Sequence, residues 1–203
     1  MKIIAIGRNY VEHARELNNP LPTEPVVFLM PSTCIIQRNK PFFYPDFSTD
    51  IHHEVELVLK ISRVGKNIDE KFAHRYYDQI GIGIDFTARD LQKIAKEKGL
   101  PWEKAKAFDG AAPLGLFLDK SQFDDPGNIP FSLKINGDLV QQGNSRDMIF
   151  SFDQLIAYVS KFFSLQIGDL IFTGTPAGVG PVKIGDRLEA FIGDESLLNF
   201  SVK

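Results

Sequence analysis

The sequence predicts a single domain, residues 1–203, of the α+β class, mainly β with a few short helices. Three observations predict this class. Apolar residues recur at every second position over residues 55–61 and 80–84, which is the period of a β-strand. Helix-start signals are few, and they lie at Asn9, Thr87 and Ser151. The 203 residues suit one well-cored domain, and no linker or shift in composition divides them.

Composition excludes several classes of function. The formal net charge is −3 and no basic run is present, so we expect no nucleic-acid partner. The single cysteine, Cys34, excludes an internal disulfide and a cysteine-based zinc cluster, which fits a reducing cytosol. The apolar run at the start stops at Gly7, too early for a signal peptide, and no membrane-length segment follows. We therefore expect a soluble, cytoplasmic protein with no membrane partner.

The N-terminal segment predicts a strand followed by a short helix. Residues 2–6 are apolar and read as a buried strand. Asn9 is placed to cap a helix that runs through Glu16, with Glu12 as its capping-box partner. Residues 18–20, Asn-Asn-Pro, end this helix.

After an apolar strand over residues 26–30, the most informative strand is predicted over residues 51–61. Glu54 and Glu56 share the face opposite its apolar side chains, because side chains alternate across a strand. Two carboxylates on one face repel each other, and a hard divalent cation would turn the pair into a binding site. The alternative is that both glutamates lie on a solvated sheet face.

A second strand over residues 80–85 places isoleucines on its core face and two glycines with Asp85 on the other. Glycine within a strand marks the close approach of a ligand or another backbone, and the alternative is tight sheet packing or a bulge. If the two strands are neighbours, Glu54, Glu56 and Asp85 form an oxygen-ligand site, completed by water and substrate, of the kind that Mg²⁺ or Mn²⁺ uses.

Two further helices and a hairpin are predicted. Thr87 is placed to cap a helix that has Ile94 on its buried side and closes at Gly99. Asn136-Gly137 lies between two apolar segments and is the strongest short hairpin signal. Ser151-Phe152-Asp153-Gln154 forms a capping box that opens a helix with an apolar stripe.

Other residues have patterns typical of catalysis. His13 and Glu16 lie three residues apart on the N-terminal helix, where a carboxylate could orient an imidazole that activates water. The alternative is a surface ion pair. Lys106, among apolar neighbours, could stabilise an enolate or oxyanion, although a solvated lysine is commoner. The glycine-rich turn over residues 174–180 could present the Thr175 hydroxyl to a carboxylate, or form only a sheet corner.

Taken together, these motifs resemble the fumarylacetoacetate hydrolase (FAH) family, and in particular its short acylpyruvate hydrolase and oxaloacetate decarboxylase branch. The resemblance runs nearly end to end. Its motifs are Gly7-Arg8-Asn9-Tyr10 with His13, Pro31-Ser32-Thr33, His52-His53-Glu54-Val55-Glu56-Leu57, Asp85-Phe86-Thr87-Ala88-Arg89-Asp90, Gly99-Leu100-Pro101-Trp102, Lys106-Ala107-Phe108, Met148-Ile149-Phe150-Ser151 and Thr173-Gly174-Thr175-Pro176-Ala177-Gly178-Val179-Gly180.

The resemblance implies an FAH-type mixed β-sandwich roll, usually homodimeric, with Mg²⁺ or Mn²⁺ held by the three carboxylates. It also implies a His13–Glu16 dyad on a lid helix, residues 9–19, that orders when ligand binds. The substrate-binding residues that it implies are Arg8, Gln92, Arg89 and Thr175, and Lys106 joins the catalytic pair. Larger family members use a fourth carboxylate, but residues 6–10 offer none, so we expect three protein ligands.

The main functional hypothesis is a divalent-metal-dependent hydrolase that cleaves the C3–C4 bond of acylpyruvates (2,4-diketo acids). His13 would activate a water that attacks C4, and the metal and Lys106 would stabilise the pyruvate enolate that leaves. The alternatives are an oxaloacetate decarboxylase, an oxaloacetate keto–enol tautomerase or a 2-hydroxyhepta-2,4-diene-1,7-dioate isomerase, because each uses a 2-keto acid in the same pose. A non-catalytic dicarboxylate binder would not need the His13–Glu16 dyad.

Overall fold

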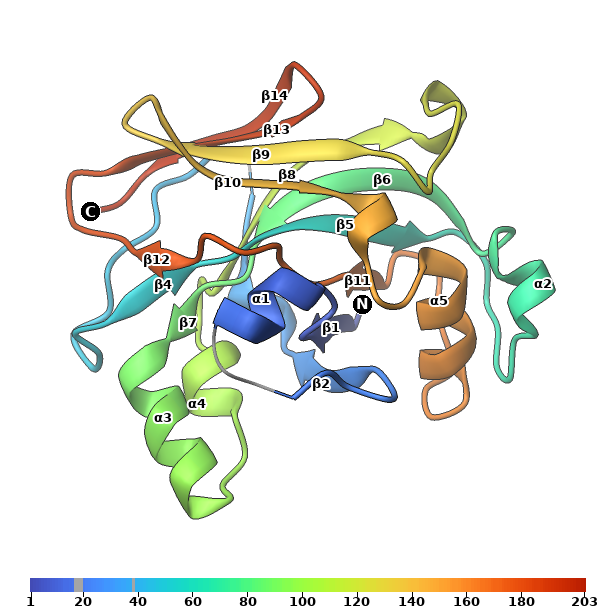
Figure 1. The fold of residues 1–203 in the computed structure, drawn as a ribbon, viewed down its shortest axis with the longest axis horizontal. Coiled ribbons are helices and arrows are strands. Elements are labelled where there is room, and N and C mark those ends of the chain that lie inside the picture. Colours follow the sequence, from blue (N-terminus) through green and yellow to red (C-terminus); the bar gives the residue numbers. More distant parts are fainter. Residues whose placement is uncertain (17–19, 38) are drawn as a thin grey trace.

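The chain forms three β-sheets joined by short helices, as the computed structural model shows for residues 1–16, 20–37 and 39–203 (Figure 1). The strands are β1 (Ile3–Gly7), β2 (Val26–Met30), β3 (Ile35–Ile36), β4 (Ile51–His53), β5 (Val55–Ile61), β6 (Tyr77–Ile84), β7 (Thr87–Ala88), β8 (Ala112–Asp119), β9 (Pro130–Ile135), β10 (Asp138–Asn144), β11 (Leu170–Phe172), β12 (Gly180–Pro181), β13 (Arg187–Ile192) and β14 (Glu195–Ser201). The helices are α1 (Val11–Glu16), α2 (Glu70–Ala73), α3 (Arg89–Lys98), α4 (Glu103–Lys106) and α5 (Phe152–Ser160), with 3-10 turns at Ser32–Cys34, Lys120–Gln122 and Ser145–Asp147. The fold is therefore mainly β with few short helices, as predicted.

The largest sheet has seven strands in the order β2-β1-β11-β5-β6-β8-β3. A four-stranded sheet, β10-β9-β13-β14, covers one of its faces, and a three-stranded sheet, β12-β4-β7, extends it at one end (Figure 1). The main core lies between the two larger sheets, where Leu57, Ile82 and Leu133 are fully buried. A smaller core that includes Val58 and Phe172 lies on the opposite face of the seven-stranded sheet.

The predicted strand over residues 51–61 is broken at Glu54, which corrects the expectation of one continuous strand. Residues 51–53 pair with β7 and β12, whereas residues 55–61 pair with β6 and β11. The chain changes sheets at Glu54, so this residue lies outside both ladders. Its carbonyl oxygen still accepts a hydrogen bond from the Asp85 N–H at 2.8 Å. The junction therefore ties the first glutamate to the end of the neighbouring strand.

The two glycines of β6 serve tight packing in this structure, not an open face for substrate. A Cβ atom on Gly83 would lie 2.7 Å from Phe172 Cε1, and one on Gly81 would lie 2.7 Å from Phe117 Cδ1. Both distances are far below an ordinary van der Waals contact, so only glycine allows the aromatic rings to lie on the strand. The packing alternative is thus the one that the structure supports.

Two helix starts differ from the prediction because their proposed caps have distant partners. Asn9 is fully buried and hydrogen-bonds Phe150 and Thr173, whereas Glu12 bonds Arg15. The sequence predicts the end of this helix at residues 18–20, and of these, residues 18 and 19 lie outside the described ranges.

Thr87 belongs to β7, and the helix that follows begins at Arg89 after Ala88. Ile94, expected on the buried side of this helix, is 44% exposed. The helix nevertheless closes at Gly99 in the left-handed conformation, as predicted.

The local motifs of the second half are confirmed. Asn136 and Gly137 both have positive φ and join β9 to β10, as a two-residue hairpin turn requires. Ser151 and Gln154 form the predicted reciprocal capping box of α5. None of the helices in the described residues has the length and apolar character that crossing a membrane requires.

Candidate metal centre and active site

Three carboxylates converge where β5 and β6 meet the three-stranded sheet. Glu54, Glu56 and Asp85 each bring an oxygen within 4.8 Å of the others, and all three residues are buried. The strand pairing explains this, because Glu56 lies opposite Gly83 and Asp85 follows two residues later. The two strands are adjacent in the sheet, as the metal-site hypothesis required. Their pairing brings the three predicted ligands together.

Two cations reach into the same cluster. Lys106, at the end of α4, places its Nζ 2.9 Å from Glu54 Oε2, 2.5 Å from Asp85 Oδ2 and 2.7 Å from Thr87 Oγ1. Arg89, at the start of α3, donates to Glu54 Oε1 and, at 2.9 Å, to Gln92 Oε1. Lys106 is only 4% exposed, and its buried charge is paired with the carboxylates of Glu54 and Asp85.

The three carboxyl groups differ in the direction in which their pKa values are shifted. Burial opposes ionisation of Glu54, but Lys106 and Arg89 outweigh it and lower the pKa of that carboxyl. Burial and the charge of Glu54 raise the pKa of Asp85 to about 7, against the opposing charges of Lys106 and Arg89. Burial and Asp85 also raise the pKa of Glu56 well above its ordinary value. Burial opposes charge on Lys106, but Asp85 and Glu54 outweigh it and raise the pKa of the ammonium.

Carboxylate oxygens of this cluster that lack hydrogen-bond donors could serve as ligands of a divalent cation. Asp85 Oδ1 is buried and has no hydrogen-bond partner among residues 1–16, 20–37 and 39–203. Glu56 Oε2 accepts the Gly174 N–H at 2.7 Å, its one hydrogen bond within the described part of the chain. Buried carboxylate oxygens without donors, close enough to share one ion, are the ligand set that Mg²⁺ and Mn²⁺ prefer. Glu54, Glu56 and Asp85 would therefore hold such a cation.

His13 and Glu16 lie on α1, which crosses in front of the sheets near this cluster (Figure 1). His13 is 4% exposed and lines the same cavity as Glu54 and Glu56, and its Nδ1 is 3.5 Å from Glu16 Oε2. Burial lowers the pKa of His13, and the charge of Arg89 adds to this against that of Glu54. The imidazole is thereby biased toward its neutral form, which is the form that accepts a proton.

Asn9 anchors the start of α1 through partners far along the chain. Its Nδ2 donates to Phe150 O at 3.0 Å and to Thr173 O at 2.8 Å, and its Oδ1 accepts from Phe150 N at 2.8 Å. These bonds hold the segment before the helix against the loop that follows β11. The position of His13 over the cluster therefore depends on Asn9.

Gln141 on β10 was not predicted from the sequence. Its Oε1 accepts from Val55 N at 3.0 Å and lies 2.9 Å from His53 Nδ1, and its Nε2 donates to Thr175 Oγ1 and Pro176 O at 2.9 and 3.0 Å. Because the Val55 N–H is a donor, the amide orientation is set and His53 Nδ1 must carry a proton. No local pattern signals such a residue, because it bridges segments that are distant in sequence.

Thr175 lines the cavity, but its hydroxyl is already engaged. It donates to Val55 O at 2.8 Å while it accepts from Gln141. The hydroxyl hydrogen is thus directed at the backbone of β5. It does not point into the cavity, where we expected it from the sequence to meet the carboxylate of a ligand. The glycine-rich turn approaches the cluster instead through the Gly174 N–H.

The cavity beside the carboxylates is small, about 30 Å³. Its walls include the remaining predicted residues, Arg8, Arg89 and Gln92, together with Phe28, Lys96 and Trp102, which were not predicted. Lys96 could have been found from the sequence, since residues 89, 92 and 96 follow the spacing of one helical face. All ten predicted site residues except Glu16 and Asp85 line this cavity, and those two contact residues that do.

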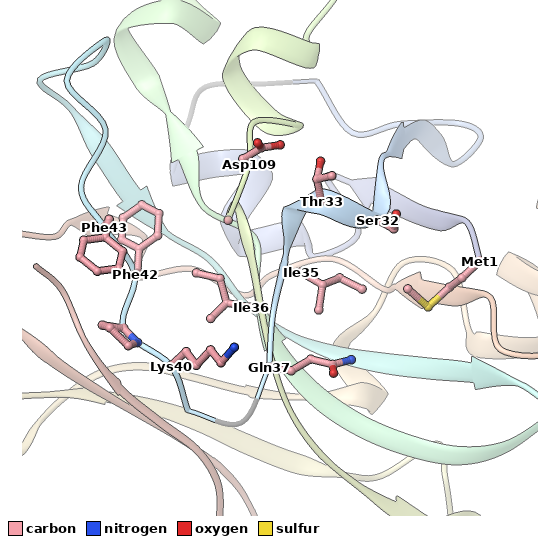
Figure 2. Close-up of a pocket in the computed structure, with 12 residues that line it drawn as sticks. Met1, Ser32, Thr33, Ile35, Ile36, Gln37, Lys40, Phe42, Phe43 and Asp109 are labelled. Carbon is pink, nitrogen blue, oxygen red and sulfur yellow. The ribbon is translucent and has the colours of Figure 1, made fainter.

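A larger groove, of about 690 Å³, lies apart from this site (Figure 2). Ile35, Ile36, Phe42 and Phe43 give it an apolar wall, and Asp109 is the single acidic residue among its described lining residues. It shares no lining residue with the carboxylate cavity. Among the described residues, the one group of acidic, histidine or cysteine side chains placed to share a metal ion lies at the carboxylate cluster and not in this groove.

Fold and site together define a class, a mainly β protein with a buried acidic site suited to a divalent cation. Residues 2–202 match the family model described as fumarylacetoacetate (FAA) hydrolase C-terminal. The chain belongs to the fumarylacetoacetate hydrolase family.

Similar proteins fall into several activities. Oxaloacetate tautomerase YcgM of Escherichia coli K12 is 41% identical over 97% of this chain and 90% of its own length. Mitochondrial oxaloacetate decarboxylase of Dictyostelium discoideum is 44% identical over 94% of this chain and 88% of its own. Fumarylpyruvate hydrolase of Pseudomonas aeruginosa, in complex with Mn²⁺ and pyruvate, has a TM-score of 0.94 and 35% identity over 100% of this chain and 89% of that one. These names favour the oxaloacetate alternatives over the main hypothesis of acylpyruvate hydrolysis.

Proposed function

We propose that this protein is a metal-dependent enzyme that enolises oxaloacetate, acting as a keto–enol tautomerase with accompanying decarboxylase activity. One observation carries the proposal. A buried, charged Lys106 and a His13 biased toward its neutral form stand at the same carboxylate cluster. A base for the C3 proton and a fixed positive charge beside the C2 oxygen are what the transfer of a proton from carbon to oxygen requires. The activities named for the relatives from E. coli and Dictyostelium support the choice of substrate.

Glu54, Glu56 and Asp85 would hold the cation, Mg²⁺ or Mn²⁺, which when bound would polarise the carbonyl and carboxylate oxygens of a 2-keto acid. The Mn²⁺ and pyruvate in the P. aeruginosa relative support this assignment. Arg89 and Gln92, which hydrogen-bond each other on α3, orient the substrate from the other wall of the cavity.

The proton transfer follows from the two groups. The His13 imidazole accepts a proton from C3, the electron pair of that C–H bond forms the C2–C3 double bond, and negative charge develops on the C2 oxygen. The Lys106 ammonium stabilises this charge in a buried, weakly polarisable site. Its three N–H groups contact Glu54, Asp85 and Thr87, so a substrate oxygen must replace one of these partners to receive a hydrogen bond. Return of the proton to oxygen gives the enol, and loss of CO₂ from C4 would give the same charge on C2 oxygen.

Acylpyruvate hydrolysis is the second candidate, and the His13–Glu16 pair favours it. Only that reaction needs an activated water, and Glu16 lies 3.5 Å from His13 Nδ1, where it can stabilise the imidazolium that forms. The same imidazole would deprotonate water in place of C3. The fumarylpyruvate hydrolase from P. aeruginosa supports this candidate.

The deciding experiment compares three reactions of the purified protein loaded with Mg²⁺ or Mn²⁺. Conversion of enol-oxaloacetate to its keto form, decarboxylation of oxaloacetate and cleavage of acetylpyruvate are measured side by side, each with and without chelator. We expect metal-dependent tautomerisation to have the highest kcat/KM. A higher kcat/KM for acetylpyruvate would make the hydrolase the principal activity and overturn the proposal.

The two-copy assembly implied by the family resemblance remains part of the proposal. Light scattering coupled to size-exclusion chromatography should give a molecular mass near twice the 22.8 kDa of one chain. A mass near that of one chain would contradict it.

A further inference from the structure

One wall of the cavity carries positively charged side chains that are not paired with the carboxylate cluster. Arg89, Gln92 and Lys96 lie at helical spacing on α3, so they share one face of the helix, and all three line the cavity. Arg8 lines the same cavity from the segment between β1 and α1. The wall is thus built from two parts of the chain, α3 and the segment around residue 8.

The cations of this wall differ in their partners. Arg89 and Lys106 contact Glu54 and Asp85. Arg8 and Lys96, in contrast, form no ion pair with any residue in the described ranges 1–16, 20–37 and 39–203. Positive charges that line a small cavity without acidic partners favour an anionic ligand group there.

Three further observations concern Arg8 and Lys96. Arg8 has a φ of 60°, a left-handed backbone conformation that costs a non-glycine residue energy and is retained most often at functional sites. Lys96 Nζ lies 5.8 Å from the centre of the Trp102 ring, which holds the ammonium at the cavity. Partial desolvation lowers the pKa of Lys96, and the charges of Arg8 and Arg89 add to this against that of Glu54.

We propose that Lys96, with Arg8, binds the second carboxylate of a dicarboxylic 2-keto acid and thereby determines substrate specificity. This inference rests on the proposed function, because it takes the 2-keto acid group to lie at the carboxylate cluster. A substrate with an uncharged tail would leave Arg8 and Lys96 without a counterion, whereas oxaloacetate supplies a carboxylate at C4. Lys96 thus selects for the dicarboxylate without taking part in the proton transfer.

The test uses oxaloacetate and pyruvate, which differ only in the carboxylate at C4. KM for oxaloacetate and the inhibition constant of pyruvate are measured on the metal-loaded wild type and on Lys96→Gln. Loss of one charge-assisted hydrogen bond at a partly exposed site should raise KM for oxaloacetate about tenfold. The pyruvate constant should stay within about twofold, and Lys96→Arg should retain most of the affinity for oxaloacetate.

Lys93→Gln is the matched control, because it removes the same charge from an exposed position on the same helix that does not line the cavity. It should leave both constants unchanged. An equal change in both constants for Lys96→Gln, or no change in either, would overturn the inference.

Failure of the proposed function is distinguishable from failure of this inference. If the folded, metal-loaded protein turns over no oxaloacetate, calorimetric titration with pyruvate and with the stable dicarboxylate 2-oxoglutarate still compares the two ligand classes. A preference for 2-oxoglutarate that Lys96→Gln abolishes would support the role of Lys96 without the proposed reaction. The absence of such a preference would reject it.

Discussion

The carboxylate of Glu16 accepts the backbone N–H of Gly178 through both of its oxygens, at 3.1 and 3.2 Å. This pair joins the end of α1 to the loop that follows β11, and Asn9 joins the start of the helix to the same region. A helix of six residues is marginal by itself, so these two attachments hold His13 at the cavity. The sequence predicts the helix as a lid, and its attachment points are the places where such a lid would open.

Removing the imidazole should separate hydrolysis, which needs a base to activate water, from decarboxylation, which needs no base. In His13→Ala, acylpyruvate hydrolysis should fall by about 10²–10⁴-fold, the usual loss when a general base is removed. Oxaloacetate decarboxylation should fall much less, because Lys106 still stabilises the developing charge. Both rates are measured with metal at saturation. An equal fall in the two, with metal binding intact, would rule out His13 as the base that activates water.

The pH dependence of the hydrolytic activity should reflect the burial of His13. Burial lowers the pKa of His13 below its ordinary value of 6.5, so the neutral base persists to lower pH than it would in water. The acid limb of the kcat/KM profile should therefore have its midpoint below 6.5, with activity falling only as the pH drops through it. The limb should be absent from the residual activity of His13→Ala. A midpoint above 6.5 in the wild type would contradict the role of burial.

Glu56→Gln should abolish activity without weakening the fold. The substitution removes a cation ligand, and we expect kcat/KM to fall more than about 100-fold. Because burial and Asp85 raise the pKa of Glu56, its charged form is disfavoured in the metal-free protein. In chelator, the thermal midpoint of the variant should equal or exceed that of the wild type. Glu97→Gln, at an exposed position on α3, serves as the control for both measurements. Full wild-type turnover after exhaustive chelation would exclude the metal requirement.

Gly83→Ala should act on stability and not on ligand access. The added methyl group would lie 2.7 Å from Phe172 Cε1, and such overpacking costs about 1–3 kcal/mol of unfolding free energy in urea denaturation. Phe172→Leu in the same chain should recover part of the loss. Gly7→Ala meets no atom closer than 3.8 Å and should have a much smaller effect. Unchanged stability together with a selective loss of affinity for pyruvate would show instead that this face of the strand contacts the substrate.

Gln141→Leu should lower the free energy of unfolding, because Gln141 supports the segments that carry the carboxylate cluster. It would leave the buried Val55 N–H and Pro176 carbonyl without their partners, each at a cost of about 1–3 kcal/mol. We expect a loss of roughly 2–4 kcal/mol in urea denaturation, within the upper range for single substitutions. Gln142→Leu, at the exposed neighbouring position, should be close to neutral. Equal effects from the two variants would show that the Gln141 hydrogen bonds do not hold the site.

The features that the sequence by itself determined are those set by neighbouring residues. The period-two pattern placed Glu56 and the isoleucines of β6 on opposite faces, and register then brought Asp85 to the glutamates. The hairpin at Asn136 and the capping box at Ser151 depend on one to three adjacent residues, so both could be predicted. The family motifs identified the same candidate residues and the fold.

The tertiary structure alone decided the positions whose partners lie far along the chain. Asn9 and Thr87 are residue types that commonly cap helices. In the structure, however, the Asn9 side chain hydrogen-bonds Phe150 and the Thr87 hydroxyl accepts from Lys106. The two strand glycines could equally have faced a ligand, and only the packing of Phe117 and Phe172 against them shows otherwise. Gln141 gives no local signal because its bonds join β10 to segments more than 30 residues away. Long-range hydrogen bonds and close packing overrode local propensity at these sites, because a buried polar group must find its partner wherever the fold brings one.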